Sequence, residues 1–308
     1  MKWAKRGLIA DRETVPGWAT YSALTPTPVV LNDDVVRIYA GFRDGDGVSR
    51  IGFIDLDARN PQQIIAVSEK PALDIGRPGM FDDNGVILGD IIRIGDAYRM
   101  YYVGFQKVQK AKFLAFSGMA TSVDGGETFT RHSEAPVLDR ADGALFINAI
   151  HTVMPREQGG FLAWVAQGNG WEIRNGIPYP QYDIWERTSA DGIRFDTPSR
   201  KLIALEGDEY RIGRPSVFRR PDGGFGMFYT RGYISSNDYK AGIAFSPDGS
   251  NWTRMDEQFG LVLGTDNDFD SRHLCYPRLF EAHGKVWAIY NGNDMGAAGF
   301  GLAELLEW

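Results

Sequence analysis

The sequence predicts an all-β protein, a five-bladed β-propeller of four-stranded antiparallel blades that occupies residues 1–308 as one domain. Three observations support this prediction: a Ser-x-Asp-Gly turn motif that recurs along the chain, five similar aromatic-rich segments, and two chain ends that each supply part of one blade. Asp-Gly between two apolar runs is a strong hairpin signal, because glycine tolerates the positive φ of a tight turn. A hairpin repeated at roughly even spacing indicates a repeat architecture.

The turn motif occurs at Ser122–Phe129, Ser189–Phe195 and Ser246–Trp252. Each copy follows small and apolar residues and precedes another strand-like run. Aspartate is favoured in such turns because its carboxylate accepts hydrogen bonds from nearby backbone N–H groups. We therefore interpret the three aspartates as turn residues rather than catalytic ones.

Five segments with alternating aromatic and apolar residues resemble one another and predict the second strand of each blade. An inner strand is expected before each, and a third strand, the turn and a fourth strand after it. The predicted second strands are Val35–Phe42, Ala97–Phe105, Gly160–Ala166, Gly224–Thr230 and Lys285–Tyr290. The predicted inner strands are Leu24–Leu31, Gly85–Ile94, Ala149–Pro155, Pro215–Arg220 and Pro277–Ala282.

The two chain ends are expected to complete the last blade together. Gly299–Trp308 supplies only a third strand, and Ala4–Ala10 can supply the missing fourth, which predicts closure by pairing of the two ends. The alternative is a β-sandwich or two small β domains. A long helix is not expected, since no apolar period of 3.6 residues is sustained.

Composition limits the classes of function. The net charge of −7 argues against a nucleic-acid or anionic-membrane partner. The single cysteine, Cys275, excludes an internal disulfide framework and a cysteine-based zinc site. No apolar stretch is long enough to span a membrane, and no apolar signal core follows the basic start. We expect a cytoplasmic monomer or weak homo-oligomer without cofactor or metal.

Blade geometry brings the starts of the inner strands and the loops after the second strands to one face, with the Asp-Gly turns on the opposite face. Carboxylates, arginines and aromatic residues from every blade converge there on one central depression, a common ligand site in closed β structures. Such a lining suits a sugar, because aromatic faces cover the ring while polar groups bind its hydroxyls. Loop caps and rim salt bridges are the alternative interpretation.

Five stretches carry a resemblance to known proteins: Gly79–Val86, Gly213–Val217, Tyr276–Phe280, Tyr290–Asp294 and Gly299–Gly301. They resemble the five-bladed propeller superfamily of glycoside hydrolases, which includes arabinanases, β-xylosidases, fructosidases and mannoside phosphorylases, and in particular the glycosidase-like proteins related to family 43. The resemblance covers essentially the whole chain. It implies an enzyme that acts on a glycosidic bond of a small or modified sugar in the central pocket.

The resemblance also implies three acids near the starts of the first three inner strands: a base, a pKa-tuning aspartate and a general acid. Only the second blade matches, at Asp83 or its neighbour Asp82; residues 22–28 contain no acid, and residues 146–152 contain no glutamate. Replacement acids could be Asp44, Glu172, Glu209 or Asp270. We predict Asp83, Glu209 and Asp270 as catalytic residues, because glycoside hydrolysis needs two carboxyl groups. The predicted substrate-binding residues are Arg43, Asp44, Asp82, His151, Trp171, Arg214, Arg231, Tyr276 and Asn291.

Other functions stay open. The turn motif resembles the Asp-box of sialidases, but these have six blades, so only an acidic sugar substrate is retained from that comparison. A phosphorylase needs one acid plus cations for phosphate, which Lys107, His151, Arg214 and Arg231 could supply. A non-catalytic carbohydrate-binding propeller is the alternative from another class. Because Arg43, Arg214 and Arg231 suit bidentate capture of an anion, we expect an anionic sugar, a sugar phosphate or a sugar nucleotide.

Overall fold

The computed structural model describes residues 1–14, 16–195, 199–236 and 239–308, and its regular secondary structure is almost entirely β-strand. The described part contains one 3-10 turn, Asp256–Gln258, and one short helix, α1 (Asn293–Gly296). No helix in the described ranges is long and apolar enough to cross a membrane. The predicted all-β class is therefore confirmed.

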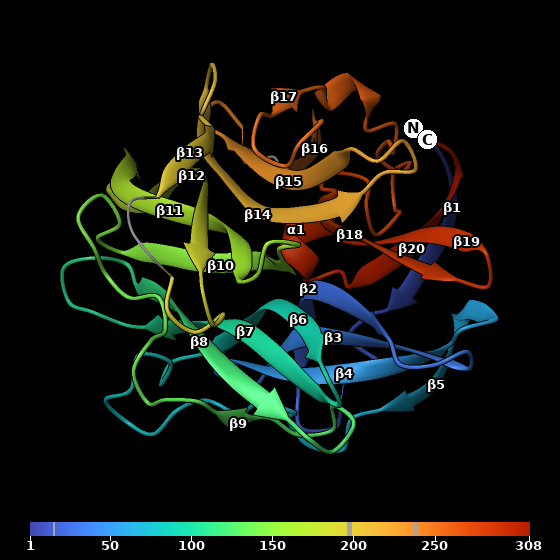
Figure 1. Cartoon of the computed structure of the whole chain (residues 1–308), viewed down its shortest axis with the longest axis horizontal. Helices are drawn as coiled ribbons and strands as arrows, with labels where there is room; N and C mark the ends of the chain where they lie inside the picture. Colours follow the sequence, from blue (N-terminus) through green and yellow to red (C-terminus); the bar gives the residue numbers. More distant parts are fainter. Residues whose placement is uncertain (15, 196–198, 237–238) are drawn as a thin grey trace.

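Consecutive strands form antiparallel groups that follow one another around a common centre, close to which α1 lies (Figure 1). One four-stranded sheet contains β2 (Tyr21–Val30), β3 (Val35–Arg43), β4 (Ser49–Asp57) and β5 (Asn60–Val67). The next group contains β6 (Val86–Ile94), β7 (Ala97–Gln106), β8 (Leu114–Ser122) and β9 (Thr130–Arg131).

Two further groups continue the same sheet. The first consists of β10 (Ile147–Pro155), β11 (Phe161–Arg174), β12 (Ile177–Ser189) and β13 (Arg200–Ile203). The second consists of β14 (Glu209–Arg219), β15 (Phe225–Tyr233), β16 (Tyr239–Ser246) and β17 (Thr253–Arg254). Short parallel contacts, β8 with β10 and β12 with β14, join the groups into one twelve-stranded sheet.

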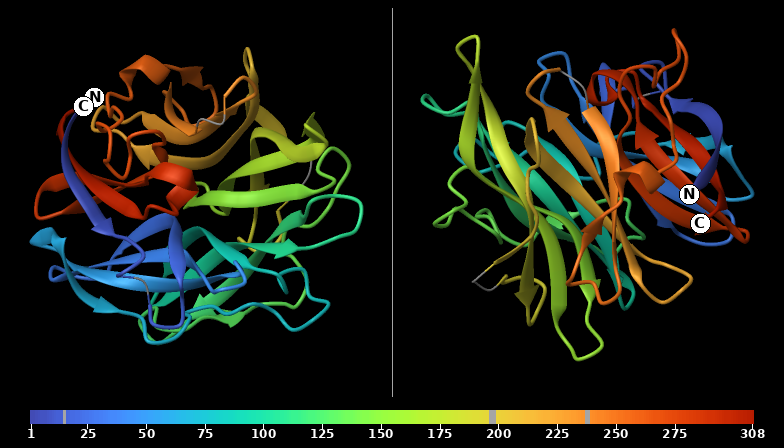
Figure 2. Two further views of the ribbon diagram at one scale, coloured as in Figure 1. Left: turned by 180° about the vertical axis from the view of Figure 1, so that it is seen from behind. Right: turned by 90° about the horizontal axis from the view of Figure 1, so that it is seen from above.

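The last sheet unites the two ends of the chain. Its order is β1 (Lys2–Ala10), β20 (Phe300–Glu307), β19 (Lys285–Asn291) and β18 (Cys275–Ala282). β1 pairs antiparallel with β20, as predicted, and both views of Figure 2 place the termini side by side. Among the described residues the strand pairings form three sheets that are not joined into one continuous ring, although one isolated parallel bridge links Lys240 of β16 to Leu274, just before β18.

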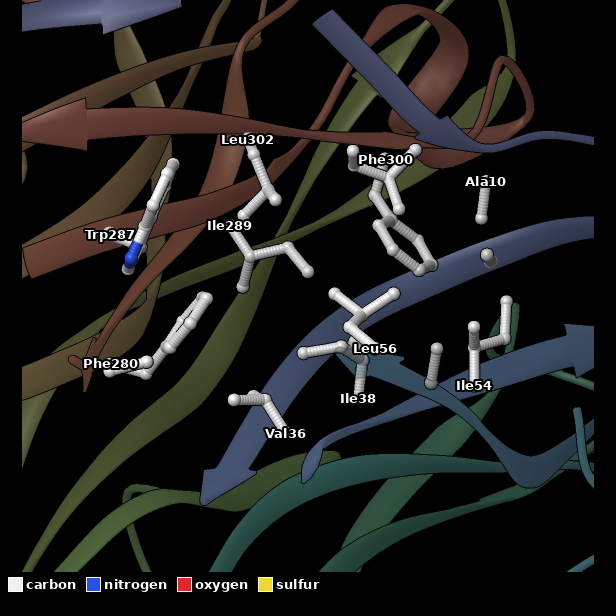
Figure 3. Packing of buried hydrophobic residues seen from close by; sticks show 14 of the residues in the cluster. Ala10, Val36, Ile38, Ile54, Leu56, Phe280, Trp287, Ile289, Phe300 and Leu302 are labelled. Atoms are coloured by element: carbon white, nitrogen blue, oxygen red, sulfur yellow. The ribbon is translucent and has the colours of Figure 1, made fainter. Parts of the chain in front are cut away.

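Buried apolar side chains pack between neighbouring sheets. One cluster joins Val36 and Ile38 of β3 to Ile289 of β19 and to Phe300 and Leu302 of β20 (Figure 3). Each such side chain contributes about 1.5–3 kcal/mol when it is fully buried. This core connects the sheet that contains β1 and β18–β20 to the sheet that contains β2–β5.

The Asp-Gly turns are built by local hydrogen bonds. Asp191 accepts from the backbone N–H groups of Ile193 and Arg194 at 2.8 and 2.9 Å, and the Ser189 hydroxyl accepts from the N–H of Gly192. Asp124 and Asp248 bind their turns in the same way. None of the three aspartates lines the central cavity described below.

Candidate functional site

The strands β2, β6, β10, β14 and β18 each carry an irregularity in their pairing with the following strand. The register shifts between Leu24 and Thr27 in β2, between Leu88 and Asp90 in β6 and between Ile150 and Thr152 in β10. The same occurs between Gly213 and Ser216 in β14 and between Cys275 and Arg278 in β18. Such bulges re-aim side chains, and here they bring Thr25, His151, Arg214 and Tyr276 to the wall of one central cavity.

This cavity has a volume of about 520 Å³ and is the candidate site. Its apolar wall contains Ile87, Val103, Phe105, Phe113 and Ile147. Its polar wall contains Thr25, Arg43, Ser49, Asn84, Gln106, Lys107, Lys112, His151, Tyr182, Arg211, Arg214, Thr230, Tyr239, Tyr276 and Asp294. A cavity of this size, largely apolar with convergent polar groups, is typical of small-molecule sites.

Three residues of the wall have left-handed backbone conformations. Thr25, Arg214 and Tyr276 have φ of 59°, 58° and 57°, and a proline follows each. A residue before proline normally adopts an extended conformation. Left-handed non-glycine residues cost roughly 1–3 kcal/mol each and cluster at functional sites.

Buried polar contacts hold two of these conformations. The Asn291 carboxamide accepts from the Thr25 N–H at 2.8 Å and donates to the Ala23 and Gly299 carbonyls. The Thr230 hydroxyl accepts from the Tyr276 N–H at 2.9 Å. Asn291, predicted to bind substrate, is fully buried and is not among the residues that line the cavity, so here it positions Thr25.

Arg214 is a buried cation that contacts only neutral groups among the interactions described. Its guanidinium donates to the Leu88 carbonyl, contacts the His151 Nδ1 at 3.2 Å and reaches the Thr25 carbonyl at 3.5 Å. Burial, and then repulsion from Arg278, lower the pKa of Arg214 below its usual value. An uncompensated buried charge is costly, so an anion in the cavity would stabilise this residue.

His151 and Arg278 lie next to Arg214. Arg278 has its own carboxylate partner, because it donates to Asp90 at 2.7 Å. Burial, followed by the charges of Arg214 and Arg278, holds the pKa of His151 well below its usual 6.5. His151 is therefore neutral at pH 7, and its Nδ1 is free to accept from Arg214.

Tyrosine rings surround Arg211, the second arginine of the cavity wall. Its guanidinium lies 4.7 Å from the Tyr210 ring centre and 4.3 Å from that of Tyr239. Its Nε is buried without a hydrogen-bond partner in the described structure. Tyr182, Tyr239 and Tyr276 also line the cavity, and no hydrogen bond is described for any of their hydroxyl groups.

Further cations and aromatic rings lie around the cavity. Arg43, Lys107 and Lys112 contribute to the lining, and Nε of Arg43 is also buried without a partner in the described structure. Phe105 and Phe113 form an aromatic wall with ring centres 5.4 Å apart. Trp171, predicted to bind substrate, lies 6.0 Å from the Phe113 ring and supports that wall without being among the lining residues.

Carboxylates are scarce in this cavity. Asp294 alone lines it among the described residues, and it is largely exposed and bonded to Arg272 at 2.9 Å. The predicted catalytic residues Glu209 and Asp270 are buried in ion pairs elsewhere. Glu209 pairs with Arg254 at 2.7 Å, and Asp270 pairs with Lys5 at 2.6 Å. The structure thus does not bring a carboxylate pair to the cavity wall.

Three predicted residues likewise have protein partners. Asp44 pairs with Arg50 at 2.5 Å; burial would raise the pKa of Asp44, but the hydrogen bonds from Arg50 and Val48 lower it. Asp82 is fully buried and pairs with Arg131 at 2.7 Å. Arg231 pairs with Asp256 at 2.7 Å and lies 3.9 Å from Glu209. None of the three lines the cavity.

Asp83 is a partly exposed carboxylate for which no ion pair is found among the described residues. Its Oδ2 accepts from the Gly79 N–H at 2.9 Å. Asn84 and Gly85, which follow it, line the central cavity, whereas Gly79 and Phe81, which precede it, line a second depression of about 410 Å³. In the chain, Asp83 therefore lies between residues that line the second depression and residues that line the cavity.

Of the predicted site residues, Arg43, His151, Arg214 and Tyr276 come together in the cavity. Tyr182, Tyr239, Lys112 and Arg211 were not among the predicted binding residues. Only Arg211 carried a usable signal, because it lies three residues before Arg214 in the segment that leads into Pro215. No group of three or more histidine, cysteine or acidic side chains suited to a metal ion occurs among the described residues.

Comparison with solved structures defines the class of fold. The chain superimposes on a glycoside hydrolase with a TM-score of 0.74 at 17% identity, covering 99% of this chain and 92% of that one. A β-1,2-mannobiose phosphorylase from Listeria innocua, in complex with β-1,2-mannobiose, gives 0.69 at 13% identity, with coverages of 99% and 96%. A thermostable family-43 glycoside hydrolase gives 0.64 at 13%, with coverages of 95% and 91%.

At these identities the likeness establishes the fold alone. The chain has the fold of the propeller-type glycoside hydrolases and mannoside phosphorylases, which confirms the resemblance predicted from the sequence.

The family is shown at the level of sequence. No model of a known protein family matches the chain. It is 31% identical over 311 residues to an uncharacterized protein of Mycobacterium tuberculosis, Rv1502 in strain H37Rv and MT1551 in strain CDC 1551. The match covers 99% of both proteins. The chain belongs to the same family as this mycobacterial protein.

Proposed function

We propose that the protein binds a small carbohydrate carrying an anionic group, a phosphate or a carboxylate, in the central cavity. One observation carries this proposal: five of the charged residues that line the cavity are Arg43, Lys107, Lys112, Arg211 and Arg214, against the single carboxylate of Asp294. No ion pair with a carboxylate is described for any of these five cations. A charged group of the ligand would supply the missing partner.

The chemistry of the wall supports this assignment. Guanidinium groups bind phosphate and carboxylate through parallel hydrogen bonds, which are roughly twice as strong as neutral ones. Arg211 and Arg214 can donate such bonds, and Tyr182, Tyr239 and Tyr276 can add neutral donors. Phe105 and Phe113 offer an apolar surface for the face of a sugar ring. The neighbours in structure act on carbohydrates, which is consistent with this ligand class.

A direct binding experiment tests the proposal. Isothermal titration with glucose, glucose 6-phosphate and glucuronate compares a neutral sugar with two anionic ones, and inorganic phosphate tests the anion alone. We expect the anionic probes to bind at least about tenfold more tightly than glucose, since one charge-assisted hydrogen bond contributes about 1.5–3 kcal/mol. Binding of glucose with equal affinity, or binding of none of the anions, would refute the proposal.

A second candidate function is cleavage of a glycosidic bond by phosphate. It is favoured by the place of Asp83 in the chain, two residues after Phe81 of the second depression and directly before Asn84 of the cavity wall, although Asp83 itself is among the lining residues of neither hollow. A phosphate oxygen held by the arginines would attack the anomeric carbon while the glycosidic C–O bond breaks. As the general acid, Asp83 would give a proton to the leaving sugar oxygen. Hydrolysis by two carboxyl groups has less support, because the cavity wall contributes only Asp294.

Turnover separates these functions. Release of a sugar phosphate that requires both phosphate and Asp83 would establish phosphorolysis. Release of reducing sugar without phosphate would establish hydrolysis instead. Saturable binding of the anionic probes with no product from a panel of disaccharides would leave carbohydrate binding as the function.

We also propose that the strand groups form five propeller blades in one domain. The register shift repeated in β2, β6, β10, β14 and β18 supports this, because it recurs once in each group. The cytoplasmic location and the monomeric or weakly oligomeric state stay predictions.

A further inference from the structure

The second depression adjoins the central cavity. It has a volume of about 410 Å³. Its lining residues are Gly79, Phe81, Gln106, Leu114, Phe116, Glu134, Ala135, Pro136, Asp139 and Arg140. Gln106 lines both hollows. No hydrogen bond of the Gln106 side chain is found among the described residues, so its amide is available to a ligand that passes from one hollow to the other.

Backbone hydrogen bonds fix the part of the cavity wall that lies next to Gln106 in the chain. The Asn84 N–H donates to the Phe105 carbonyl at 3.0 Å, and the Phe105 N–H donates to the Gly85 carbonyl at 2.8 Å. These bonds hold residues 84–85 against the end of β7. Gly79 and Phe81, which precede Asp83, line the second depression, and Asn84 and Gly85, which follow it, line the cavity.

We propose that the ligand of the central cavity extends across Gln106 and places a neutral sugar unit in the second depression. This inference rests on the proposed function, because it assumes that the anionic end of the ligand occupies the cavity. It makes the ligand at least a disaccharide with its charge at one end.

The side chains of the second depression suit a neutral sugar. Phe81 and Phe116 supply aromatic surface, and the Arg140 guanidinium lies 5.7 Å from the Phe116 ring centre. Arg140, Asp139 and Gln106 offer donors and acceptors to hydroxyl groups. Glu134 and Asp139 would repel a second anion, and Glu134 is already bonded to Arg77 at 2.6 Å. The charge balance thus differs from that of the cationic cavity.

Titration of matched monosaccharides and disaccharides tests the inference. The two series are glucose 6-phosphate with trehalose 6-phosphate, and glucuronate with an aldobiouronic acid in which glucuronate is joined to one neutral xylose. In the series whose monosaccharide binds more tightly, we expect the disaccharide to gain about tenfold in affinity. Arg140→Ala should remove most of this gain and leave the affinity for inorganic phosphate unchanged within about twofold.

Arg93→Ala is the matched control, because Arg93 is an exposed arginine that lines neither hollow. It should retain the full gain. A gain below about twofold in both series, or a gain that Arg140→Ala does not reduce, would overturn the extended site while phosphate binding still supports the proposed function. Failure of inorganic phosphate and of both monosaccharides to bind would overturn the two together.

Discussion

Replacing Arg211 with glutamine should weaken anion binding without unfolding the protein. Arg211 lines the cavity, its Nε is buried without a partner in the described structure, and its guanidinium rests on the rings of Tyr210 and Tyr239. Arg211→Gln removes the charge and keeps most of the side-chain length. Arg214 is a less suitable first choice, because it also donates to the carbonyls of Leu88 and Thr25.

The size of the effect follows from the bonds at stake. Loss of one charge-assisted hydrogen bond costs about 1.5–3 kcal/mol, which corresponds to a loss of affinity between about tenfold and about 150-fold. Stability should change little. The substitution removes two contacts between the Arg211 cation and tyrosine rings, each of which contributes about 0.5–1 kcal/mol. It also removes the energetic cost of burying the Arg211 charge without a carboxylate partner, which offsets that loss.

The assay is isothermal titration of Arg211→Gln and Arg93→Gln with inorganic phosphate at one fixed low salt concentration, together with thermal unfolding of each variant. We expect weaker binding only in Arg211→Gln and similar unfolding temperatures in both. If wild-type protein and Arg211→Gln bind phosphate equally well, Arg211 is not part of the anion site. If both variants weaken binding equally, the effect is one of general surface charge.

Three further predictions concern the scaffold. Asp191→Ala should lower the free energy of unfolding by about 1 kcal/mol, because the N–H groups of Ile193 and Arg194 lose their acceptor, and should leave phosphate affinity unchanged; an unaltered denaturation midpoint would contradict the assigned turn role. Since burial and then the charges of Arg214 and Arg278 hold the pKa of His151 well below 6.5, the folded chain binds fewer protons than the unfolded chain below that pH, and stability should fall from pH 6.5 towards about pH 5. His151→Gln should flatten this slope, and denaturant unfolding that gives the same slope in both proteins would show that another group is responsible. Gly126→Ala should cost roughly 1–3 kcal/mol, because Gly126 has φ +87° and a Cβ there would lie 2.2 Å from the Tyr39 hydroxyl; full retention of the unfolding temperature would argue against this close approach.

Local signals in the sequence predicted most of the fold. The five aromatic-rich segments correspond to β3, β7, β11, β15 and β19, and the turn aspartates bind the backbone as their Ser-x-Asp-Gly context indicated. The Arg-Pro and Tyr-Pro pairs likewise marked Arg214 and Tyr276, which both reach the cavity. These features are carried by residues close together in the chain.

The partners of the acids could not be predicted in this way. Glu209 is neutralised by Arg254, 45 residues away, and Asp270 by Lys5, 265 residues away. Tyr182 and Tyr239 reach the cavity from β12 and β16, and nothing in their local sequence shows how far these strands extend towards the centre. Tertiary packing decides whether a carboxylate faces the ligand or instead pairs with a buried cation. The sequence therefore predicted too many acids at the site and too few arginines without a carboxylate partner.

The most direct test of the anionic-ligand proposal is a crystal structure of the protein grown with glucose 6-phosphate. We expect the phosphate oxygens to lie within hydrogen-bond distance of Arg211 and Arg214, with the sugar ring against Phe105 or Phe113. A cavity that excludes the phosphate, or a sugar bound through Asp294 with its phosphate directed into solvent, would contradict it.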